Sequence, residues 1–363
     1  MKNISPSAAA VRRATAVFVS SLGLAATLAS CGSDAKPVYT SLVVFGSSLS
    51  DVGSYKAGSI AAVGGGRSTI NPGKIWVEHL ADAAKVEIKA GMVGFAGTPT
   101  ICPTAPCTGW AQGGSRITNP NGANKSLGLL TVPVVQQMDL QLAQKASYSA
   151  NDLVIVASGP NDVYVLADGI AAATASLVAS GTSPSSAQAQ VLQGVNTAVV
   201  AAGNELVDAI EKKILAKGAI YVALLTSDDI NGTPFAASIG AANTVIVSQL
   251  ISLLNSTIAD GIKAKNLNVV TLDTNSFTKL VLADPGAYGI ANKTDPACDP
   301  AKIATVSGGL VTTGNALLCS ASTLKSGVDA DTWMYADTLH YASRMHKLLS
   351  DYVVSQLAIK GWF

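Results

Sequence analysis

The amino-acid sequence predicts a doubly wound α/β domain, a three-layer α/β/α sandwich with a central, mostly parallel, five-stranded sheet. Two observations carry this prediction. Apolar runs of the length of buried strands alternate with longer stretches of helical period. The short runs are apolar throughout, which is typical of a parallel sheet covered on both faces. With 363 residues, 48% of them hydrophobic, the chain can bury a substantial core.

Five runs are expected to form the strands: SLVVF from residue 41, a weaker KVEIKA from 85, DLVIVAS from 152, AIYVALL from 219 and LNVVTL from 267. The stretches predicted to be helical include GKIWVEHLADAA, VPVVQQMDLQLAQKA, IAAATASLVASG, the alanine-rich region from 184 to 217, ANTVIVSQLISLLNSTIADGIKA and an amphipathic C-terminal stretch. The segment from 286 to 330 is a long loop for a compact domain, and long ordered loops often border a site.

The charge pattern argues against nucleic acid as a partner. The formal net charge is +1, only 13% of the residues are charged, and the lysines and arginines are scattered rather than clustered. The sequence therefore predicts a small, neutral or apolar ligand. It leaves the oligomeric state open.

The N-terminus has the pattern of an export signal. Lys2, Arg12 and Arg13 precede the apolar run ATAVFVSSLGLAATLA, which is too short and too weakly apolar for a membrane span. The following LASC resembles the bacterial lipobox, in which the cysteine, here Cys31, is lipidated; ordinary cleavage near Ala29 is the alternative. We expect a signal peptide over residues 1–31, a tether over 32–38 and one domain over 39–363.

This resemblance implies a protein exported to the bacterial cell envelope and held at the membrane by a lipid on Cys31. Residue 32 is Gly rather than the aspartate linked with inner-membrane retention in some bacteria, which favours the outer membrane.

Four further cysteines are an even number in an exported chain, where disulfides persist. Nearest-neighbour pairing would join Cys102 to Cys107 and Cys298 to Cys319. Zinc binding is disfavoured, because CPTAPC has the wrong spacing and no histidine lies near either pair.

Ser48 is the first candidate for chemistry. It follows the first predicted strand in VVFGSSLSDVG, and Gly46 allows a tight turn there. At the carboxyl end of a strand, its hydroxyl would lie at the edge of the sheet where ligands bind in α/β folds. Its backbone N–H would lie at a helix N-terminus, where partial positive charge favours an anion. The alternative is that the serines of this stretch only cap the helix.

To act as a nucleophile, a serine needs a base, and the base is usually oriented by a carboxylate. The stretch YADTLHYAS supplies a histidine and an aspartate within one turn. Asp337 stands three residues before His340, so the carboxylate can bond one ring nitrogen while the other faces a hydroxyl. An ordinary carboxylate at a helix start is the alternative. His79 and His346 fall inside helical patterns and are interpreted as structural.

Two further stretches offer hydrogen-bond donors for an oxyanion. DLVIVAS runs into GPND, where the Asn161 amide can donate from the end of a central strand; an Asx-type turn is the alternative. The glycine turn WAQGGS can expose a backbone N–H, with Gly114 the preferred donor and Gly113 the alternate.

Together these stretches resemble the motif blocks of the SGNH or GDSL hydrolases, in that family's order. FGSSLSDVG is similar to FGDSLSDxG, WAQGGS to the glycine block, GPND to GxND and DTLH to DxxH, and the resemblance runs from about residue 40 to the end. It implies a flavodoxin-like fold and hydrolysis of carboxylic esters through an acyl-enzyme intermediate, without a metal or other cofactor. Ser48 would be the nucleophile, His340 the base and Asp337 its partner. The N–H groups of Ser48 and Gly114 and the Asn161 amide would form the oxyanion hole.

Two residues depart from the family pattern. Ser47 replaces the aspartate before the nucleophile, and Tyr341 follows the histidine where proline is common. Neither change removes a reacting group, but Ser47 leaves two readings. The first is an active esterase or lipase for short- to medium-chain acyl esters or lipids. The second is a weakened or silent envelope lipoprotein that binds an acylated ligand.

Overall fold

Four parallel strands form the central sheet, in the order β1-β4-β5-β6. The computed structural model describes residues 36–97, 99–103, 106–157 and 159–363, so the predicted signal peptide and Cys31 lie outside the described residues. The strands are β1 (Ser41–Gly46), β4 (Asp152–Ala157), β5 (Tyr221–Leu225) and β6 (Val270–Leu272). All three pairings are parallel and β1 pairs with β4 in full register, Ser41 opposite Asp152 and Gly46 opposite Ala157. The predicted fold class is confirmed.

The prediction of a fifth strand at 85–90 is wrong. The edge of β1 is instead occupied by residues 108–112, where the Val44 N–H donates to Thr108 and the Trp110 N–H donates back to Val44. The segment 85–90 meets this edge at one bridge, between Ala90 and Gly109. Its side chains are exposed or half-buried, so it lacks the two-sided burial that continuous strands need. A separate two-stranded antiparallel ribbon, β2 (Met92–Val93) and β3 (Thr100–Ile101), follows it.

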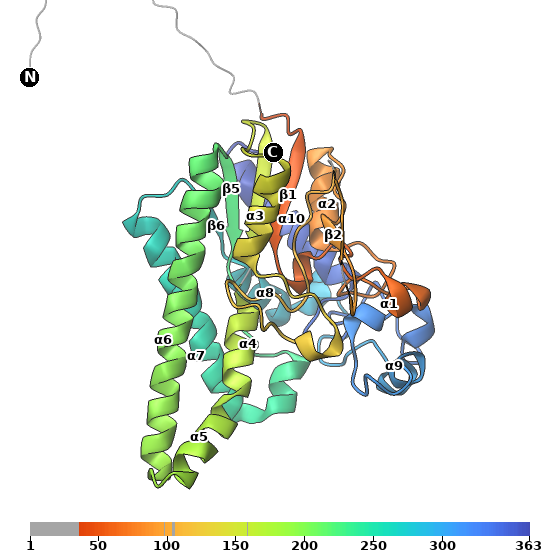
Figure 1. The fold of residues 1–363 in the computed structure, drawn as a ribbon. Helices are drawn as coiled ribbons and strands as arrows, with labels where there is room; N and C mark the ends of the chain where they lie inside the picture. The colour runs from red at the N-terminus through yellow and green to blue at the C-terminus, as the bar shows by residue number, and fades with distance from the viewer. Residues whose placement is uncertain (1–35, 98, 104–105, 158) are drawn as a thin grey trace, which may run out of the picture. The chain divides into compact units, whose positions relative to one another are not determined.

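Helices cover both faces of the sheet (Figure 1). On one face lie α3 (Val134–Gln144), α4 (Pro160–Asp168), α6 (Pro184–Ala209) and α7 (Pro234–Ala264), and α6 continues through a π-helical turn, η3 (Ile210–Ile214). On the other lie α2 (Trp76–Ala84), α8 (Thr274–Ala283) and α10 (Ser343–Ile359). Alternate strand residues serve the two cores: Val43, Phe45 and Val154 face the first, while Leu42, Val44 and Leu153 face the second.

The remaining elements lie outside these two layers of helices. The short helix α1 (Gly58–Ala62) precedes α2, and α5 (Ile170–Ala179) extends from the end of α4 to the start of α6. The loop predicted at 286–330 contains α9 (Pro300–Val306) and three short helical turns, η5 (Pro285–Tyr288), η6 (Ala316–Leu318) and η7 (Ala321–Thr323). It packs on α1 through a third apolar cluster that contains Ile60, Ile303 and Leu317.

Both predicted disulfide pairings are present, Cys102–Cys107 and Cys298–Cys319. The second one closes the segment that contains α9 and η6, and its two cysteines are fully buried in the third cluster. This anchoring matters for function, because the backbone of the same loop reaches a carboxylate of the site described next.

Candidate active site

The turn after β1 places Ser48 at the carboxyl edge of the sheet. Gly46 has φ +151° and lies so close to β4 that an added Cβ would come 2.1 Å from the Ala157 carbonyl oxygen. The Gln137 side chain of α3 holds this glycine from both sides, accepting from its N–H at 2.9 Å and donating to its carbonyl at 3.0 Å. The chain then enters a single 3₁₀ turn, η1 (Ser48–Ser50). Only glycine permits this close crossing, so the turn fixes the position of Ser48.

His340 bridges Ser48 and Asp337. Its Nε2 lies 2.9 Å from the Ser48 Oγ, and its Nδ1 lies 2.8 Å from Asp337 Oδ2 and 3.0 Å from Oδ1. The structure therefore brings together the three side chains that the sequence singled out from opposite ends of the chain. The hydrogen-bonded order hydroxyl, imidazole, carboxylate is the one that lets a serine lose its proton to a base.

The Asp337 carboxylate organises its own loop. It accepts the N–H groups of Leu339 at 2.9 Å and His340 at 2.8 Å on Oδ1, and that of Ala316, from the disulfide-tied loop, at 2.8 Å on Oδ2. Residues 337–340 are an irregular turn rather than a helical one. The bridge between Tyr335 and Tyr341 closes this turn at its base. Asp337 thus fixes both the loop and the imidazole.

Electrostatics within this pair favour charge separation. Burial of the imidazole disfavours its protonated form, but the Asp337 carboxylate and its hydrogen bond outweigh burial, and the pKa of His340 is raised above its usual value of 6.5. Burial disfavours the ionised Asp337, but His340 and the backbone N–H groups outweigh it, and the pKa of Asp337 is lowered. The adjacent Asp337 carboxylate would stabilise an imidazolium formed by proton transfer to His340.

The candidate oxyanion donors are two backbone N–H groups and one side-chain amide. The N–H groups of Ser48 and Gly114 have no acceptor among the described residues. Gly114 has φ +79°, and a Cβ there would lie 2.3 Å from the Ala123 carbonyl oxygen, so this position also needs glycine. The Asn161 amide donates one N–H to the Ser115 carbonyl at 2.9 Å, which orients it and leaves its second N–H. Asn161 and Ser48 line the same small cavity, of about 60 Å³.

Sequence reasoning missed Asp51, which holds the glycine turn. This fully buried carboxylate accepts the N–H groups of Gly53 at 2.9 Å and Ser54 at 2.6 Å on Oδ1, and the Ser54 hydroxyl at 2.6 Å on Oδ2. Oδ2 also accepts the Gly113 N–H at 3.0 Å. Because the Gly113 N–H is engaged there, Gly114 remains the preferred candidate of the two. Burial raises the pKa of Asp51 although these hydrogen bonds oppose the shift. The signal in the sequence was the aspartate three residues after Ser48.

The two departures from the family pattern sit on the walls of the cavity. Ser47 is buried beside Ser48, and its N–H donates to Ala157 at 3.3 Å. The Tyr341 hydroxyl donates to the Asp228 carboxylate and lies 3.1 Å from the Thr278 hydroxyl. Burial raises the pKa of Asp228. Asp228, at the end of β5, was not predicted either, and it makes this wall polar.

The other two histidines are structural. His346 of α10 is fully buried, accepts the Trp76 N–H on Nδ1 at 3.3 Å, and has its pKa lowered by burial to about 3. His79 of α2 is partly exposed, and burial followed by nearby lysines lowers its pKa. Within the described part of the chain, no group of three or more His, Cys, Asp or Glu side chains could hold a metal ion.

Comparisons with known proteins give one family. Residues 42–353 match the family model described as GDSL-like Lipase/Acylhydrolase, which confirms the resemblance of the motif blocks. Among solved structures, the chain is similar to the extracellular lipase from Streptomyces rimosus, with 17% identity over 65% of this chain and 81% of that one and a TM-score of 0.33. No curated protein matches the chain.

Proposed function

Because this chain belongs to the GDSL-like lipase/acylhydrolase family, we propose that it is a serine hydrolase of carboxylic esters that works through an acyl-enzyme intermediate. The observation that carries the proposal is the hydrogen-bonded series in which His340 lies 2.9 Å from the Ser48 hydroxyl and 2.8 Å from the Asp337 carboxylate. No group besides these side chains and water is required to balance the reaction.

In the proposed first half-reaction, the Ser48 Oγ attacks the ester carbonyl carbon while its proton passes to His340 Nε2. Asp337 stabilises the resulting imidazolium through Nδ1. The tetrahedral intermediate collapses when the bond to the alkoxide breaks, and His340 returns the proton to the departing alcohol. The Ser48 and Gly114 N–H groups and the free Asn161 N–H would stabilise the oxyanion in both halves.

In the second half-reaction, water takes the place of the alcohol. His340 accepts a proton from the water as its oxygen attacks the acyl-enzyme, and then protonates Ser48 as the carboxylic acid leaves. The substrates we propose are short- to medium-chain acyl esters or lipids.

The experiment that tests the function is hydrolysis of a p-nitrophenyl ester series, acetate through palmitate, by a soluble form that begins after Cys31. In parallel, a fluorophosphonate probe is reacted with the protein and the labelled peptide is identified by mass spectrometry. We expect ester turnover and a label on Ser48. Turnover with the label on another serine would contradict the assignment of the nucleophile.

The pH dependence of kcat/KM tests the role of His340. The base must be neutral to accept a proton, so activity is lost as the pH falls through the pKa of the free enzyme's imidazole. Since the pKa of His340 is raised, the acid limb should have its midpoint above pH 6.5. Asp337→Asn removes the carboxylate that raises the pKa of His340. The midpoint should therefore move to lower pH, and the plateau rate should fall. An unchanged midpoint in that variant would argue against the pairing.

A second candidate function rests on Ser47, which stands where the family has an aspartate. In that reading the protein is a weakened or silent hydrolase that binds an acylated ligand. It predicts no turnover by the parent protein and turnover by Ser47→Asp. The Asp51 contact with Gly113 supports the active reading instead, because a buried carboxylate still holds the oxyanion turn.

We also propose that the protein is anchored in the bacterial envelope by a lipid on Cys31, in the outer membrane rather than the inner one. In the described part of the chain, residues 160–179 and 234–264 are long and apolar enough to cross a bilayer by length and composition alone, a test that helices of soluble proteins also pass. An alkyne fatty acid fed to expressing cells should label the parent protein and should not label Cys31→Ala. Equal labelling of the two would contradict the anchor.

A further inference from the structure

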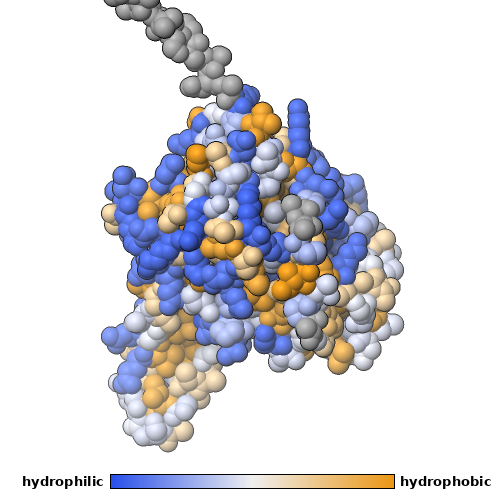
Figure 2. Space-filling view, turned by 45° about the horizontal axis from the view of Figure 1, so that its top comes forward, coloured by the Kyte–Doolittle hydropathy of each residue, from blue (hydrophilic) through white to orange (hydrophobic). Residues whose placement is uncertain are grey.

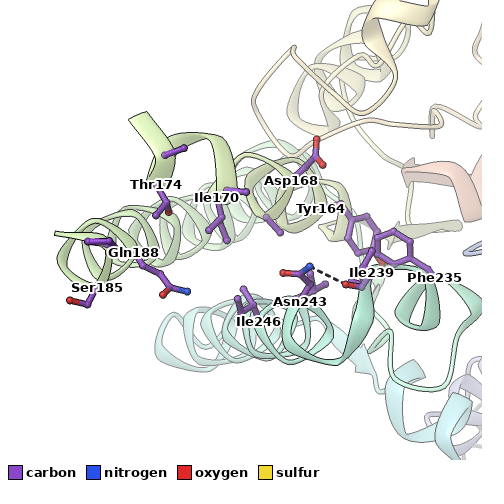
Figure 3. A pocket seen from close by; sticks show the side chains of 15 residues that line it. Tyr164, Asp168, Ile170, Thr174, Ser185, Gln188, Phe235, Ile239, Asn243 and Ile246 are labelled. Carbon is purple, nitrogen blue, oxygen red and sulfur yellow. Dashed lines mark hydrogen bonds between the residues drawn. The ribbon is translucent and has the colours of Figure 1, made fainter. Parts of the chain in front are cut away.

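A long groove lies beside the small catalytic cavity, between α4, α5 and the start of α6 on one side and α7 on the other (Figure 3). Its volume is about 880 Å³, within the range of sites that hold whole small molecules. Apolar side chains form most of its inner part: Tyr164, Ile170, Phe235, Ile239 and Ile246. Its outer end carries uncharged polar side chains, Thr174, Ser185 and Gln188, and Asp168 is the one carboxylate of the lining.

The groove begins at the catalytic cavity. Tyr164 lines both, one helical turn after Asn161 on α4. On the opposite wall, the Phe235 N–H at the start of α7 donates to the Thr338 carbonyl, between Asp337 and His340, at 2.9 Å. The Phe235 ring packs edge-on against Tyr164, with 5.7 Å between ring centroids. Of the helices that bound the groove, α4 and α7 therefore start next to the catalytic residues and lead away from them.

Most of the groove wall comes from two segments without charged side chains, and α4, which contributes Tyr164 and Asp168, is the exception. Residues 169–204 and 230–259 contain no Asp, Glu, Lys, Arg or His. None of the residues of α5 is buried, although the helix is made mainly of Ala, Ile, Leu and Val. Figure 2 shows the projecting lower part of the molecule mainly in white, pale and orange shades with blue along one edge, whereas blue and orange are mixed over the main body. Exposed surface is normally where charged residues gather, so a mainly apolar groove with one carboxylate in its described lining indicates a ligand.

We propose that this groove binds the hydrocarbon chain of the ester, so that the natural substrate is a lipid-like ester. This inference rests on the proposed ester hydrolase function and deepens it. A hydrocarbon chain needs no charged or hydrogen-bonding partner, and it is the ligand chemistry that the Ile and Phe side chains of the inner groove match. The cavity at Ser48, of about 60 Å³, holds the ester carbonyl, and the chain leaves it past Tyr164.

The test uses a pair of neighbouring alanines on α5. Both alanines are exposed, but Ala171 lines the groove and Ala172 does not. Ala171→Trp should fill the groove, and Ala172→Trp is the matched control on the same helix. We expect kcat/KM of the parent to rise by about tenfold or more from p-nitrophenyl acetate to the decanoate, because each added methylene is buried. Ala171→Trp should remove this rise and leave acetate hydrolysis unchanged, while Ala172→Trp should behave like the parent.

A second substrate series distinguishes the two possible sources of the chain. Acetate esters of alkanols from ethanol to hexadecanol carry the chain on the alcohol side, so a length dependence there that Ala171→Trp removes would place the alcohol chain in the groove. Length dependence in the acyl series alone places the acyl chain there. If neither series depends on chain length, or if Ala171→Trp and Ala172→Trp act alike, the proposal is overturned while the esterase function stands.

A binding measurement separates the groove from the chemistry. Ser48→Ala protein is titrated with cis-parinaric acid, a fluorescent long-chain fatty acid, with and without each tryptophan substitution. Binding that Ala171→Trp weakens at least about tenfold and Ala172→Trp leaves intact supports the groove even if the parent hydrolyses no ester. Absence of saturable binding, or binding that neither substitution affects, overturns it. A change of sedimentation coefficient on Ala171→Trp alone would instead identify the groove as a contact between two copies of the chain.

Discussion

Ser48→Ala is expected to lower kcat for p-nitrophenyl esters by at least about a thousandfold. The change removes the hydroxyl that is hydrogen-bonded to His340, so no covalent intermediate can form there. The remaining donors can still bind the carbonyl, and KM should therefore change much less than kcat. The measurement is steady-state hydrolysis over the ester series, with the fold checked by circular dichroism.

Ser50→Ala is the matched control for this prediction. Ser50 lies in the same 3₁₀ turn, is equally a serine, and its hydroxyl accepts the Trp76 Nε1–H at 3.2 Å away from the imidazole. Loss of that hydrogen bond should affect stability by about 1 kcal/mol and should leave kcat within about threefold. Comparable losses in the two variants would mean that the turn, rather than the Ser48 hydroxyl, sets the rate.

Much of the fold was predictable because the buried strands are continuous apolar runs. DLVIVA and YVALL each present apolar side chains to both helical layers, and only a buried parallel sheet needs that pattern. The prediction of a strand at 85–90 was wrong because the alternating pattern of this run is that of an edge segment with one side exposed to water. The residues that do occupy that edge bond to β1 through the backbone of Thr108, Trp110 and Gln112, in a stretch with two polar residues and a glycine that no strand pattern reveals.

The candidate site was predictable to the extent that chemistry demands particular residue types. A hydroxyl, an imidazole and a carboxylate were expected, and the topology brings Ser48 and His340 to hydrogen-bonding distance. Asp51 and Asp228 were missed because their significance depends on which loops fold over them. The groove was missed because α5 has no amphipathic pattern: a helix apolar on all sides predicts burial, yet this one lies at the surface.

Asp51→Asn should impair both stability and catalysis, and the reason lies in the donors that surround the carboxylate. Two backbone N–H groups, the Ser54 hydroxyl and the Gly113 N–H all point at its two oxygens. An amide keeps the shape but turns one acceptor into a donor, which leaves buried donors facing each other. We expect the free energy of unfolding to fall by about 3 kcal/mol. Released from Asp51, the Gly113–Gly114 turn should shift, and kcat should fall by about a hundredfold.

Asp152→Asn separates the positioning role of Asp51 from its role in stability. Asp152 is also buried, and it accepts from the hydroxyls of Ser41 at 2.9 Å and Ser149 at 2.7 Å, the Ser149 N–H at 2.8 Å and Lys145 at 2.7 Å. It begins β4, whereas the candidate site follows the other end of that strand. Asparagine there should also destabilise the fold, by about 2 kcal/mol, but kcat measured where both variants are fully folded should match the parent. If both variants lose the same activity, Asp51 acts only through stability. If Asp51→Asn alone loses kcat while KM is retained, the carboxylate positions the oxyanion donor, and it does so without the aspartate that the family carries at position 47.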